Sequence, residues 1–448
     1  MSNKPNKLSP LPYPLSRKAR LTIMFSLFGI FLIATPLVIL YARGYTYDFF
    51  SKNIYHGGAL SIETAPLGAT VFINDIKLKQ LTPIHLTNVL PQNYHVRIEQ
   101  PNMYAWEKDI NIVSNETTYL HDIDLFQKKL PREIELTNSM IEKIYPSENT
   151  NVFLIERQNS QNFEYSLFHM KENMETLLTR IISTSTPQID VSPNGDLIKI
   201  GFELKKEKNI LLFNPQNPFI TQSGPYSHQF QWQESSVGTK YLYQNGLSLE
   251  QMDTHSTKNL FTLSTSTVDW FIDTENTLWE YSDNEVRHYQ ENKQVFSSTV
   301  TRPVIKFIDV NDKRIIGFDG QNMVIYLRNT IDPLQEQVLP LNNYRENKAQ
   351  NYFLTWKDGE LWDILPDGSA NLLNRFSETI EDVIPLTEQG TLLLITSNKL
   401  IAFHPQYSLP QTLFEGEGIQ NFNIYKNKRE IYILKKESGV NKLLKLEY

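Results

Sequence analysis

The clearest hydrophobic pattern in this 448-residue chain is an uncharged, mostly apolar run from Leu21 to Tyr41. At about 1.5 Å rise per residue, a helix of this length crosses a hydrocarbon core of roughly 30 Å. The run has no polar face, which disfavours a buried core helix, and Pro36 within it is expected to kink the helix modestly. The pattern therefore predicts a transmembrane helix over residues 21–42.

The charges on either side of this run predict its orientation. Five basic residues and no acidic residue precede it, whereas only two basic residues follow within short reach. This asymmetry favours a cytoplasmic N-terminus and an exported remainder. A cleaved secretory signal peptide is the alternative, but the run ends at residues 39–44 without an A-x-A pattern, which favours an uncleaved signal anchor. The basic residues are Lys4, Lys7, Arg17, Lys18 and Arg20 before the run, then Arg43 and Lys52 after it.

Beyond the run, residues 57–127 alternate apolar and polar positions in short segments. This two-residue period recurs at residues 59–63, 94–99 and 108–113, and Asn74-Asp75 supplies a turn. No helical period is present in this part of the chain. The pattern predicts a small antiparallel sheet or sandwich.

Within that segment, residues 66–74, PLGATVFIN, resemble the signature of the PEGA domain, with Leu67 in place of the family's glutamate. The resemblance covers about 70 residues and implies a β-sandwich surface module of envelope proteins that has no known catalytic centre. It assigns structural roles to its motif residues, although Tyr104 and Trp106 fit either a recognition surface or a cover over the core. The motif residues are Pro66, Gly68, Ala69, Thr82, Pro83, Pro91, Tyr104 and Trp106.

From residue 134 onward, short apolar strands recur at intervals of 31 to 46 residues, with Asn-Gly and Asp-Gly turns between them. A period near 40 with about four strands per unit is typical of a β-propeller. We predict about seven blades, with six to eight permitted; an irregular pair of β-sandwiches is the alternative. The strand centres are Phe153, Ile198, Leu242, Trp279, Ile316, Trp362, Leu393 and Tyr432.

Two local patterns qualify this prediction. Residues 171–182 carry apolar side chains at helical spacing and predict a short helix within an early blade. Residues 192–196, SPNGD, resemble the Ser-Pro-Asp-Gly turn of TolB-like and WD40-like propeller repeats. The all-β ectodomain is therefore expected to contain one helical excursion and one recognisable repeat turn.

Charge and composition narrow the function. The chain carries a net charge of −7 and its first 20 residues carry +5, so the remainder carries −12. An acidic ectodomain argues against nucleic acid as a partner, because such binding relies on basic residues. The chain contains no cysteine, which excludes disulfides, thiolate metal sites and cysteine nucleophiles.

The search for catalytic motifs assigns no residue. G-x-S-x-G, H-E-x-x-H, P-loop and EF-hand patterns do not occur in the sequence. The acidic pairs Asp269 with Asp273 and Asp309 with Asp312 fit glycosidase carboxylates or calcium ligands, but ordinary turns explain them equally well. We therefore name no catalytic, cofactor-binding or metal-binding residue and expect no cofactor; the ligand-binding residues stay unknown.

The apolar run and its flanking charges predict a single-pass cell-membrane protein that displays extracytoplasmic domains, and the resemblance to the PEGA domain implies a bacterial cell envelope. We expect it to bind or scaffold in the cell envelope, with the bilayer contacting Leu21 to Tyr41 and an envelope protein or cell-wall glycan as the partner. An extracytoplasmic glycan- or peptide-acting hydrolase with its site at the propeller funnel is the alternative. The expected divisions are a disordered cytoplasmic tail (1–20), the signal anchor (21–42), a juxtamembrane linker (43–56), the PEGA-like domain (57–127), a linker (128–133) and the propeller (134–448).

Overall fold

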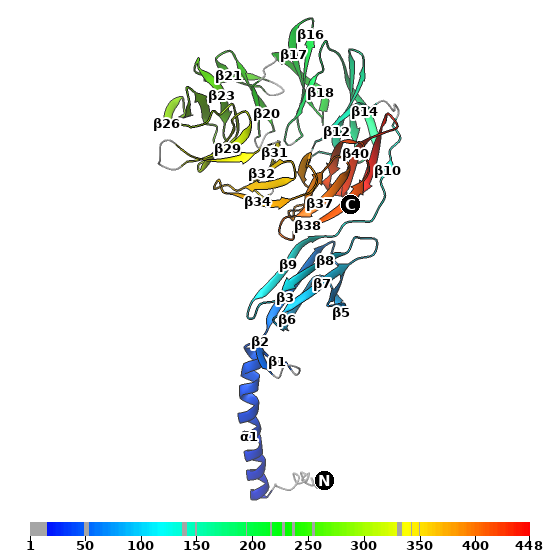
Figure 1. Cartoon of the computed structure of the whole chain (residues 1–448), viewed down its shortest axis with the longest axis vertical. Coiled ribbons are helices and arrows are strands. Elements are labelled where there is room, and N and C mark those ends of the chain that lie inside the picture. Colours follow the sequence, from blue (N-terminus) through cyan, green and yellow to red (C-terminus); the bar gives the residue numbers. More distant parts are fainter. Residues whose placement is uncertain are drawn as a thin grey trace, which may run out of the picture. The chain divides into compact units, whose positions relative to one another are not determined.

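The computed structural model divides into two compact units, Met1–Leu125 and Phe126–Tyr448, drawn in Figure 1. The residues that the structure describes are 16–48, 53–136, 141–147, 150–193, 195–215, 217–225, 229–234, 238–252, 256–328, 334–341, 343–348 and 350–448. Most of the predicted cytoplasmic tail, residues 1–15, lies outside them.

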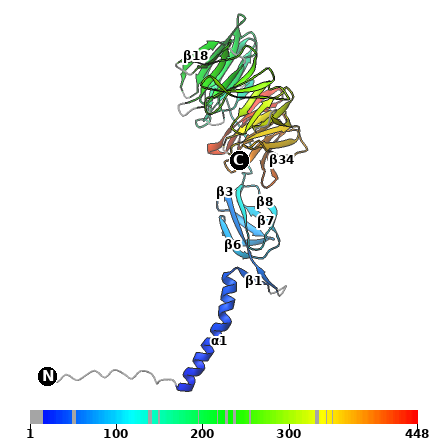
Figure 2. The same ribbon diagram turned by 90° about the vertical axis from the view of Figure 1, so that its left-hand side faces the viewer.

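The first unit begins with helix α1, Arg17–Ala42, which Figure 2 shows as one continuous helix. Ser16 caps its N-terminus by accepting a hydrogen bond from the Ala19 amide at 3.2 Å. None of its residues is buried, and Pro36 lies inside it. Among the described residues, α1 is the one helix that is long and apolar enough to cross a membrane, as an anchor or as a signal sequence. It begins four residues before the predicted apolar run.

A small β-sandwich follows a two-stranded hairpin in the first unit. The hairpin, β1 and β2, lies where a linker was expected. One sandwich layer has the order β6-β3-β9 and the other β5-β4-β7-β8; β3 and β6 lie apart from β7 and β8 in Figure 2. The strands are β1 Tyr45–Asp48, β2 Asn53–His56, β3 Gly58–Ala65, β4 Thr70–Ile73, β5 Ile76–Leu81, β6 Ile84–Val89, β7 Asn93–Glu99, β8 Trp106–Asn111 and β9 Thr117–Asp124.

The alternation seen in the sequence produces the core of this sandwich. Leu60 and Ile62 on β3, in one layer, and Val71 on β4 and Val96 on β7, in the other, are all fully buried. The prediction of a purely antiparallel sheet is wrong in one respect, because β3 and β9 pair in parallel. Parallel neighbours require a long connection, here supplied by β4 to β8.

A threonine pair explains much of the Pro-x-Gly-Ala and Thr-Pro signature. Thr64 Oγ1 and Thr82 Oγ1 lie 2.7 Å apart. The Ala69 amide donates to Thr82 Oγ1 at 2.9 Å, and Thr64 Oγ1 donates to the Pro66 carbonyl at 2.8 Å. Gly68, between these residues, has φ +87°, which a side chain would strain. The signature residues therefore form one hydrogen-bonded turn. Tyr104 and Trp106 are each half-buried.

Substituting Thr82 with valine is expected to destabilise this turn by about 1–3 kcal/mol, because the buried Ala69 amide and Thr64 hydroxyl lose their partner. Hydrogen exchange of residues 64–82 in the full chain measures the loss as faster exchange. Thr117→Val, at a half-buried position of β9, is the control and is expected to change exchange little. Equal exchange in both variants would contradict a role for the threonine pair.

The second unit consists, over its described residues, of eight four-stranded sheets. In seven of them, four consecutive strands pair in chain order; in the eighth, β10 pairs with β41 at the far end of the unit. Figure 1 shows these sheets around a ring, with the last one (red) beside the first. This is an eight-bladed β-propeller closed by its own first strand, and it confirms the predicted fold at the upper end of the blade range.

The blades are numbered along the chain from the sheet that begins with β11, which is blade 1. The sheet that contains β39 to β41 and the closing strand β10 is blade 8. Blade 1 contains β11 Lys143–Tyr145, β12 Val152–Asn159, β13 Asn162–His169 and β14 Met174–Ile182; blade 2 contains β15 Gln188–Val191, β16 Ile198–Leu204, β17 Glu207–Asn214 and β18 Asn217–Pro225. Blade 3 contains β19 Phe230–Gln233, β20 Lys240–Asn245, β21 Ser248–Met252 and β22 Thr257–Thr262; blade 4 contains β23 Thr267–Ile272, β24 Leu278–Ser282, β25 Glu285–Gln290 and β26 Lys293–Thr299. Blade 5 contains β27 Lys306–Val310, β28 Arg314–Phe318, β29 Asn322–Leu327 and β30 Gln335–Pro340; blade 6 contains β31 Asn343–Asn347, β32 Tyr352–Lys357, β33 Glu360–Ile364 and β34 Ala370–Arg375. Blade 7 contains β35 Asp382–Pro385, β36 Leu392–Ile395, β37 Lys399–His404 and β38 Leu409–Glu415; blade 8 contains β39 Ile419–Tyr425, β40 Glu430–Glu437, β41 Val440–Glu447 and β10 Arg132–Glu133, with a 3-10 turn at Lys426–Lys428.

The predicted helix over residues 171–182 is wrong, because β14 occupies Met174–Ile182. Its register against β13 shifts at Tyr165/Ser166, which leaves Leu178 as an extra residue. Such a bulge changes the phase of the in-out alternation within one strand. Of the apolar residues at helical spacing, Ile181 is buried and Leu178 packs against the core, whereas Met174 and Leu177 are about half exposed, so the four do not share one buried face.

Neighbouring blades are joined by apolar contacts and by polar side chains of their first strands. Phe153 and Phe168 of blade 1 pack against Tyr432 of blade 8. On the first strands, Gln231 accepts from the Ile272 amide at 2.8 Å and donates to its carbonyl at 2.7 Å. These contacts fix the side chains that line the spaces between blades.

Candidate functional site

Three of the four acidic residues singled out in the sequence have structural partners, and the fourth, Asp312, is exposed. Asp269 accepts a hydrogen bond from the Phe307 amide at 2.6 Å, which ties blade 4 to blade 5. Asp273 accepts from Thr277 at 2.5 Å and from Trp279 Nε1 at 2.9 Å, so it holds the turn between β23 and β24. Asp309 lies 3.2 Å from the guanidinium of Arg314, a residue of the next strand.

The other candidate turn is structural as well. Ser192 donates to Asp196 Oδ1 at 2.8 Å, and Asp196 Oδ2 accepts from the Thr239 amide of blade 3 at 2.8 Å. Asn194 of this turn lies outside the described residues. Among the described residues, no group of three or more histidine and acidic side chains is placed to hold a metal ion.

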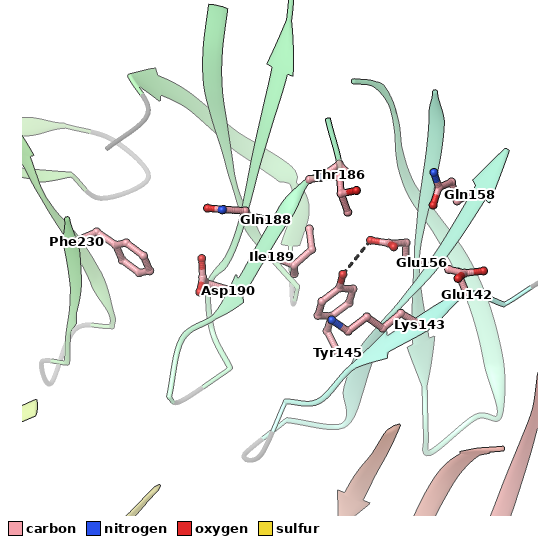
Figure 3. A pocket seen from close by; sticks show the side chains of 11 residues that line it. Glu142, Lys143, Tyr145, Glu156, Gln158, Thr186, Gln188, Ile189, Asp190 and Phe230 are labelled. Carbon is pink, nitrogen blue, oxygen red and sulfur yellow. Dashed lines mark hydrogen bonds between the residues drawn. The ribbon is translucent and has the colours of Figure 1, made fainter. Parts of the chain in front are cut away.

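A cavity of about 550 Å³ lies between blades 1, 2 and 3. Figure 3 shows Tyr145 and Glu156 on the blade 1 side, Asp190 on the blade 2 side and Phe230 beyond them on blade 3. We call this the blade 1–3 pocket. Its lining residues are Glu142, Lys143, Tyr145, Glu156, Gln158, Thr186, Pro187, Gln188, Ile189, Asp190 and Phe230.

Glu156 is the buried acid of this pocket. It follows four buried apolar residues of β12 and is itself only 3% exposed. The hydroxyls of Tyr145 and Tyr165 each donate to its Oε2 atom at 2.9 Å. Burial, followed by the nearby Glu156 charge, raises the pKa of both tyrosines, so both remain proton donors at neutral pH. Over the described residues, the Oε1 atom of Glu156 has no hydrogen-bond or ion-pair partner.

Lys199 is the buried base beside this pocket. It lies on β16 between Ile198 and Ile200 and is 1% exposed. Its Nζ atom is 2.8 Å from Asp190 Oδ2 and 3.2 Å from the centroid of the Phe230 ring. Burial lowers the pKa of Lys199, and the Asp190 carboxylate opposes that shift. An ammonium group is therefore held between a carboxylate and an aromatic face.

We expect substitution of Asp190 to lower the free energy of unfolding more than substitution of its partner Lys199 does. Asp190→Asn should lower the free energy of unfolding by about 2 kcal/mol, because it leaves a buried ammonium without a counter-charge. Lys199→Met should change it by less than about 1 kcal/mol, because methionine fills the buried path and the half-exposed Asp190 stays hydrated. Urea unfolding measured by tryptophan fluorescence compares the two variants; a larger loss for Lys199→Met would contradict this assignment.

The remaining charges make the pocket slightly acidic. Lys143 Nζ lies 4.8 Å from the centroid of the Tyr145 ring, and Glu142 precedes it at the rim. Counting Lys199 with the lining residues, the site contains three carboxylates and two ammonium groups. The carboxylates are those of Glu142, Glu156 and Asp190, and the ammonium groups are those of Lys143 and Lys199. A second cavity of about 480 Å³, between β22 and blade 4, has no charged side chain in its lining. The blade 1–3 pocket is therefore the better candidate for binding a polar or charged group.

Sequence reasoning did not find this pocket, because its residues come from three blades. One local signal was present, however. Glu156 follows four buried apolar residues of β12, and Lys199 lies between two buried isoleucines of β16. A charge at such a position is costly unless it is paired, so it marks a polar site inside the fold.

The family comparison addresses the first unit. Residues 57–125 match the family model of the PEGA domain. The resemblance drawn from residues 66–74 is thereby confirmed for about 70 residues, and the PEGA domain occupies the β-sandwich of β3 to β9. No curated protein matches the chain.

Several solved structures resemble the chain weakly. "Dihydro-heme d1 dehydrogenase NirN in complex with DHE" has 12% identity and a TM-score of 0.43, covering 63% of this chain and 67% of that one. "Crystal structure of the eukaryotic initiation factor" has 10% identity and a TM-score of 0.43, with 70% and 87% covered. Hsv2 of Kluyveromyces lactis has 8% identity and a TM-score of 0.32, with 44% and 68% covered. Similarity at this level supports no conclusion about activity, ligand or partner.

Proposed function

We propose that this protein is a membrane-anchored binding or scaffolding protein that displays its PEGA domain and propeller on the outer face of a bacterial cell membrane. The observation that carries the proposal is α1, whose 26 residues include none that is buried. Apolar side chains exposed on every side of a helix are costly in water and favourable in a lipid core. The basic residues before α1 favour a cytoplasmic N-terminus.

The propeller supports binding more than catalysis. The blade 1–3 pocket supplies hydrogen-bonding and charged groups on a rigid ring of sheets, which suits recognition. A hydrolase acting at the propeller gains no support from Asp269, Asp273 or Asp309, because each carboxylate is bonded to its own fold. The partner we propose is therefore an envelope component held by the propeller, with the bilayer contacting Leu21 to Tyr41.

Fractionation of cells expressing the full chain tests the anchor. The wild type is expected in the carbonate-resistant membrane fraction with an intact N-terminus, and protease added to spheroplasts should degrade the propeller. Changing Phe28 and Ile33 to lysine should release the protein from membranes, since each central lysine costs about 2.5–3.5 kcal/mol of insertion. Phe28→Leu with Ile33→Val is the matched control. A soluble wild-type chain that begins after Ala42 would overturn the anchor.

Binding is tested with the full chain in nanodiscs. After incubation with native envelope extract and cross-linking, we expect a defined envelope component to be retained in excess over empty nanodiscs. Retention of nothing beyond the empty-nanodisc background would count against a binding role.

A further inference from the structure

We propose that the blade 1–3 pocket binds a cationic side chain of a partner protein, a lysine ammonium or an arginine guanidinium, at Glu156 Oε1. This inference rests on the proposed binding function and specifies the chemistry of the ligand. Its basis is a buried carboxylate that receives hydrogen bonds on one oxygen and opens to the cavity on the other.

Glu156 is a buried acid whose hydrogen-bond donors are uncharged. Its two hydrogen-bond donors are neutral phenols, and among the described residues no ion pair of Glu156 within 4.0 Å occurs; Lys143, its direct cross-strand neighbour, lies against the Tyr145 ring instead. Arg157, the next residue along β12, pairs with Glu175 instead. A buried carboxylate without a counter-ion carries a large desolvation cost, which a bound cation would offset. The Oε1 atom of Glu156 is therefore a carboxylate oxygen of this pocket that has no hydrogen-bond or ion-pair partner among the described residues.

The walls of the pocket combine carboxylate and aromatic side chains, which suits a cationic ligand. The neighbouring wall already holds one ammonium, Lys199, between Asp190 and the Phe230 ring. Glu156 and Tyr145 place a carboxylate and an aromatic side chain together at the cavity wall in the same way, with Lys143 Nζ already 4.8 Å from the ring centroid, so the position left for a bound cation is Glu156 Oε1. Cations are stabilised by that pairing, because the carboxylate neutralises them and the ring face is electronegative.

A glycan fits the lining of this pocket less well than a cation does. Sugars bind by stacking on aromatic faces, but cations lie against the rings at this site: Lys199 at 3.2 Å from the Phe230 centroid and Lys143 at 4.8 Å from the Tyr145 centroid. The excess of carboxylates over ammonium groups also favours a cation. We therefore assign the pocket to a basic side chain and treat a glycan as an outcome of the test.

The experiment uses the full chain in nanodiscs and four small probes measured by saturation-transfer NMR. They are Nα-acetyl-lysine methylamide, Nα-acetyl-arginine methylamide, neutral Nα-acetyl-norleucine methylamide and the tetramer of N-acetylglucosamine. We expect at least one cationic probe to bind at least about tenfold more tightly than the norleucine probe, and to weaken as salt is raised.

Glu156→Gln is the deciding variant. The glutamine carbonyl keeps both tyrosine hydrogen bonds and its amide replaces Oε1, so cationic-probe binding should fall at least about tenfold. Glu164→Gln is the matched control: it removes the same charge from blade 1, where Glu164 pairs with Arg180 outside the pocket, and should leave binding unchanged. If Glu156→Gln fails to fold, Tyr145→Phe keeps the carboxylate and should retain cation binding, while the norleucine comparison in the wild type still decides the question.

Equal binding of the norleucine and cationic probes, or full binding by Glu156→Gln, would overturn the cation site. Binding of the sugar tetramer without binding of either cationic probe would replace it with a glycan site. The cross-linking experiment with envelope extract distinguishes failure of the cation site from failure of the binding function. A component retained equally by wild type and Glu156→Gln leaves the binding function standing and removes the cation site, whereas no retained component removes the function itself.

Discussion

Replacing Arg314 with alanine is expected to lower the free energy of unfolding of the propeller by about 3–5 kcal/mol. Arg314 is 2% exposed on β28. Its guanidinium lies 3.2 Å from Asp309 Oδ2 and donates to the carbonyls of Ile364, at 3.1 Å, and Leu365. Removing it takes the guanidinium away from the Asp309 carboxylate and the Ile364 carbonyl, while the Leu365 carbonyl keeps the Gly368 amide as a donor; the loss at the buried carboxylate is more costly than the loss of an exposed ion pair.

Urea unfolding of the full chain, followed by tryptophan fluorescence, measures this loss. Five of the six tryptophans lie in the propeller, so the signal reports mainly on that unit. Arg375→Ala is the matched control, because the Arg375 side chain is 68% exposed and pairs with Glu360 on the surface. Its expected cost is at most about 1 kcal/mol. Similar losses for both variants would show that the buried position of Arg314 is energetically unimportant.

Asp269→Asn is expected to stabilise the propeller at high pH and not at low pH. Burial raises the pKa of Asp269 to about 7, even though hydrogen bonds from the Phe307 and Trp270 amides and the charge of Lys306 act in the opposite direction. Below the ordinary carboxyl pKa of 3.8, folded and unfolded chains both hold the proton. As pH rises from about 4 to 7, the unfolded chain releases it first, so the stability contributed by this proton is progressively lost.

Asparagine keeps an oxygen for the Phe307 amide and carries no charge at any pH. The difference in unfolding free energy between Asp269→Asn and wild type should therefore increase by up to about 4 kcal/mol between pH 4 and pH 8. Urea unfolding at several pH values measures this difference. Asp312→Asn, in an exposed turn, is the control and should give a constant difference. A constant difference for Asp269→Asn would refute the pH dependence.

The sequence predicted the repeat architecture well, because each blade places one strongly apolar strand near its middle. Seven of the eight predicted strand centres lie in the second strand of a blade. The exception, Trp362, lies in the third strand of blade 6, whose second strand carries Leu354 and Trp356. Taking Leu354 as the centre changes the adjoining intervals from 46 and 31 residues to 38 and 39. Two tryptophans in neighbouring strands thus concealed the regular period.

The candidate site was less predictable, because its geometry depends on closure of the ring. Tyr145, Glu156 and Tyr165 come from three strands of blade 1, and Phe230 from blade 3. Local periodicity identifies the strands but does not determine which side chains meet between blades. The buried charges at Glu156, Lys199 and Arg314 were nevertheless visible as ionisable residues within apolar strands, and this rule would have marked the right positions.

The closing strand has a consequence for how the protein is made. β10 is only two residues long, and its partners on β41, Lys445 and Leu444, follow about 310 residues later. At 5–20 residues per second, synthesis of that interval takes roughly 15–60 s. During that time the first strand of the propeller has no partner, and blade 8 cannot be completed. The ring therefore stays unfinished for tens of seconds during synthesis, which makes early folding the stage at which the propeller is most exposed to misfolding and aggregation.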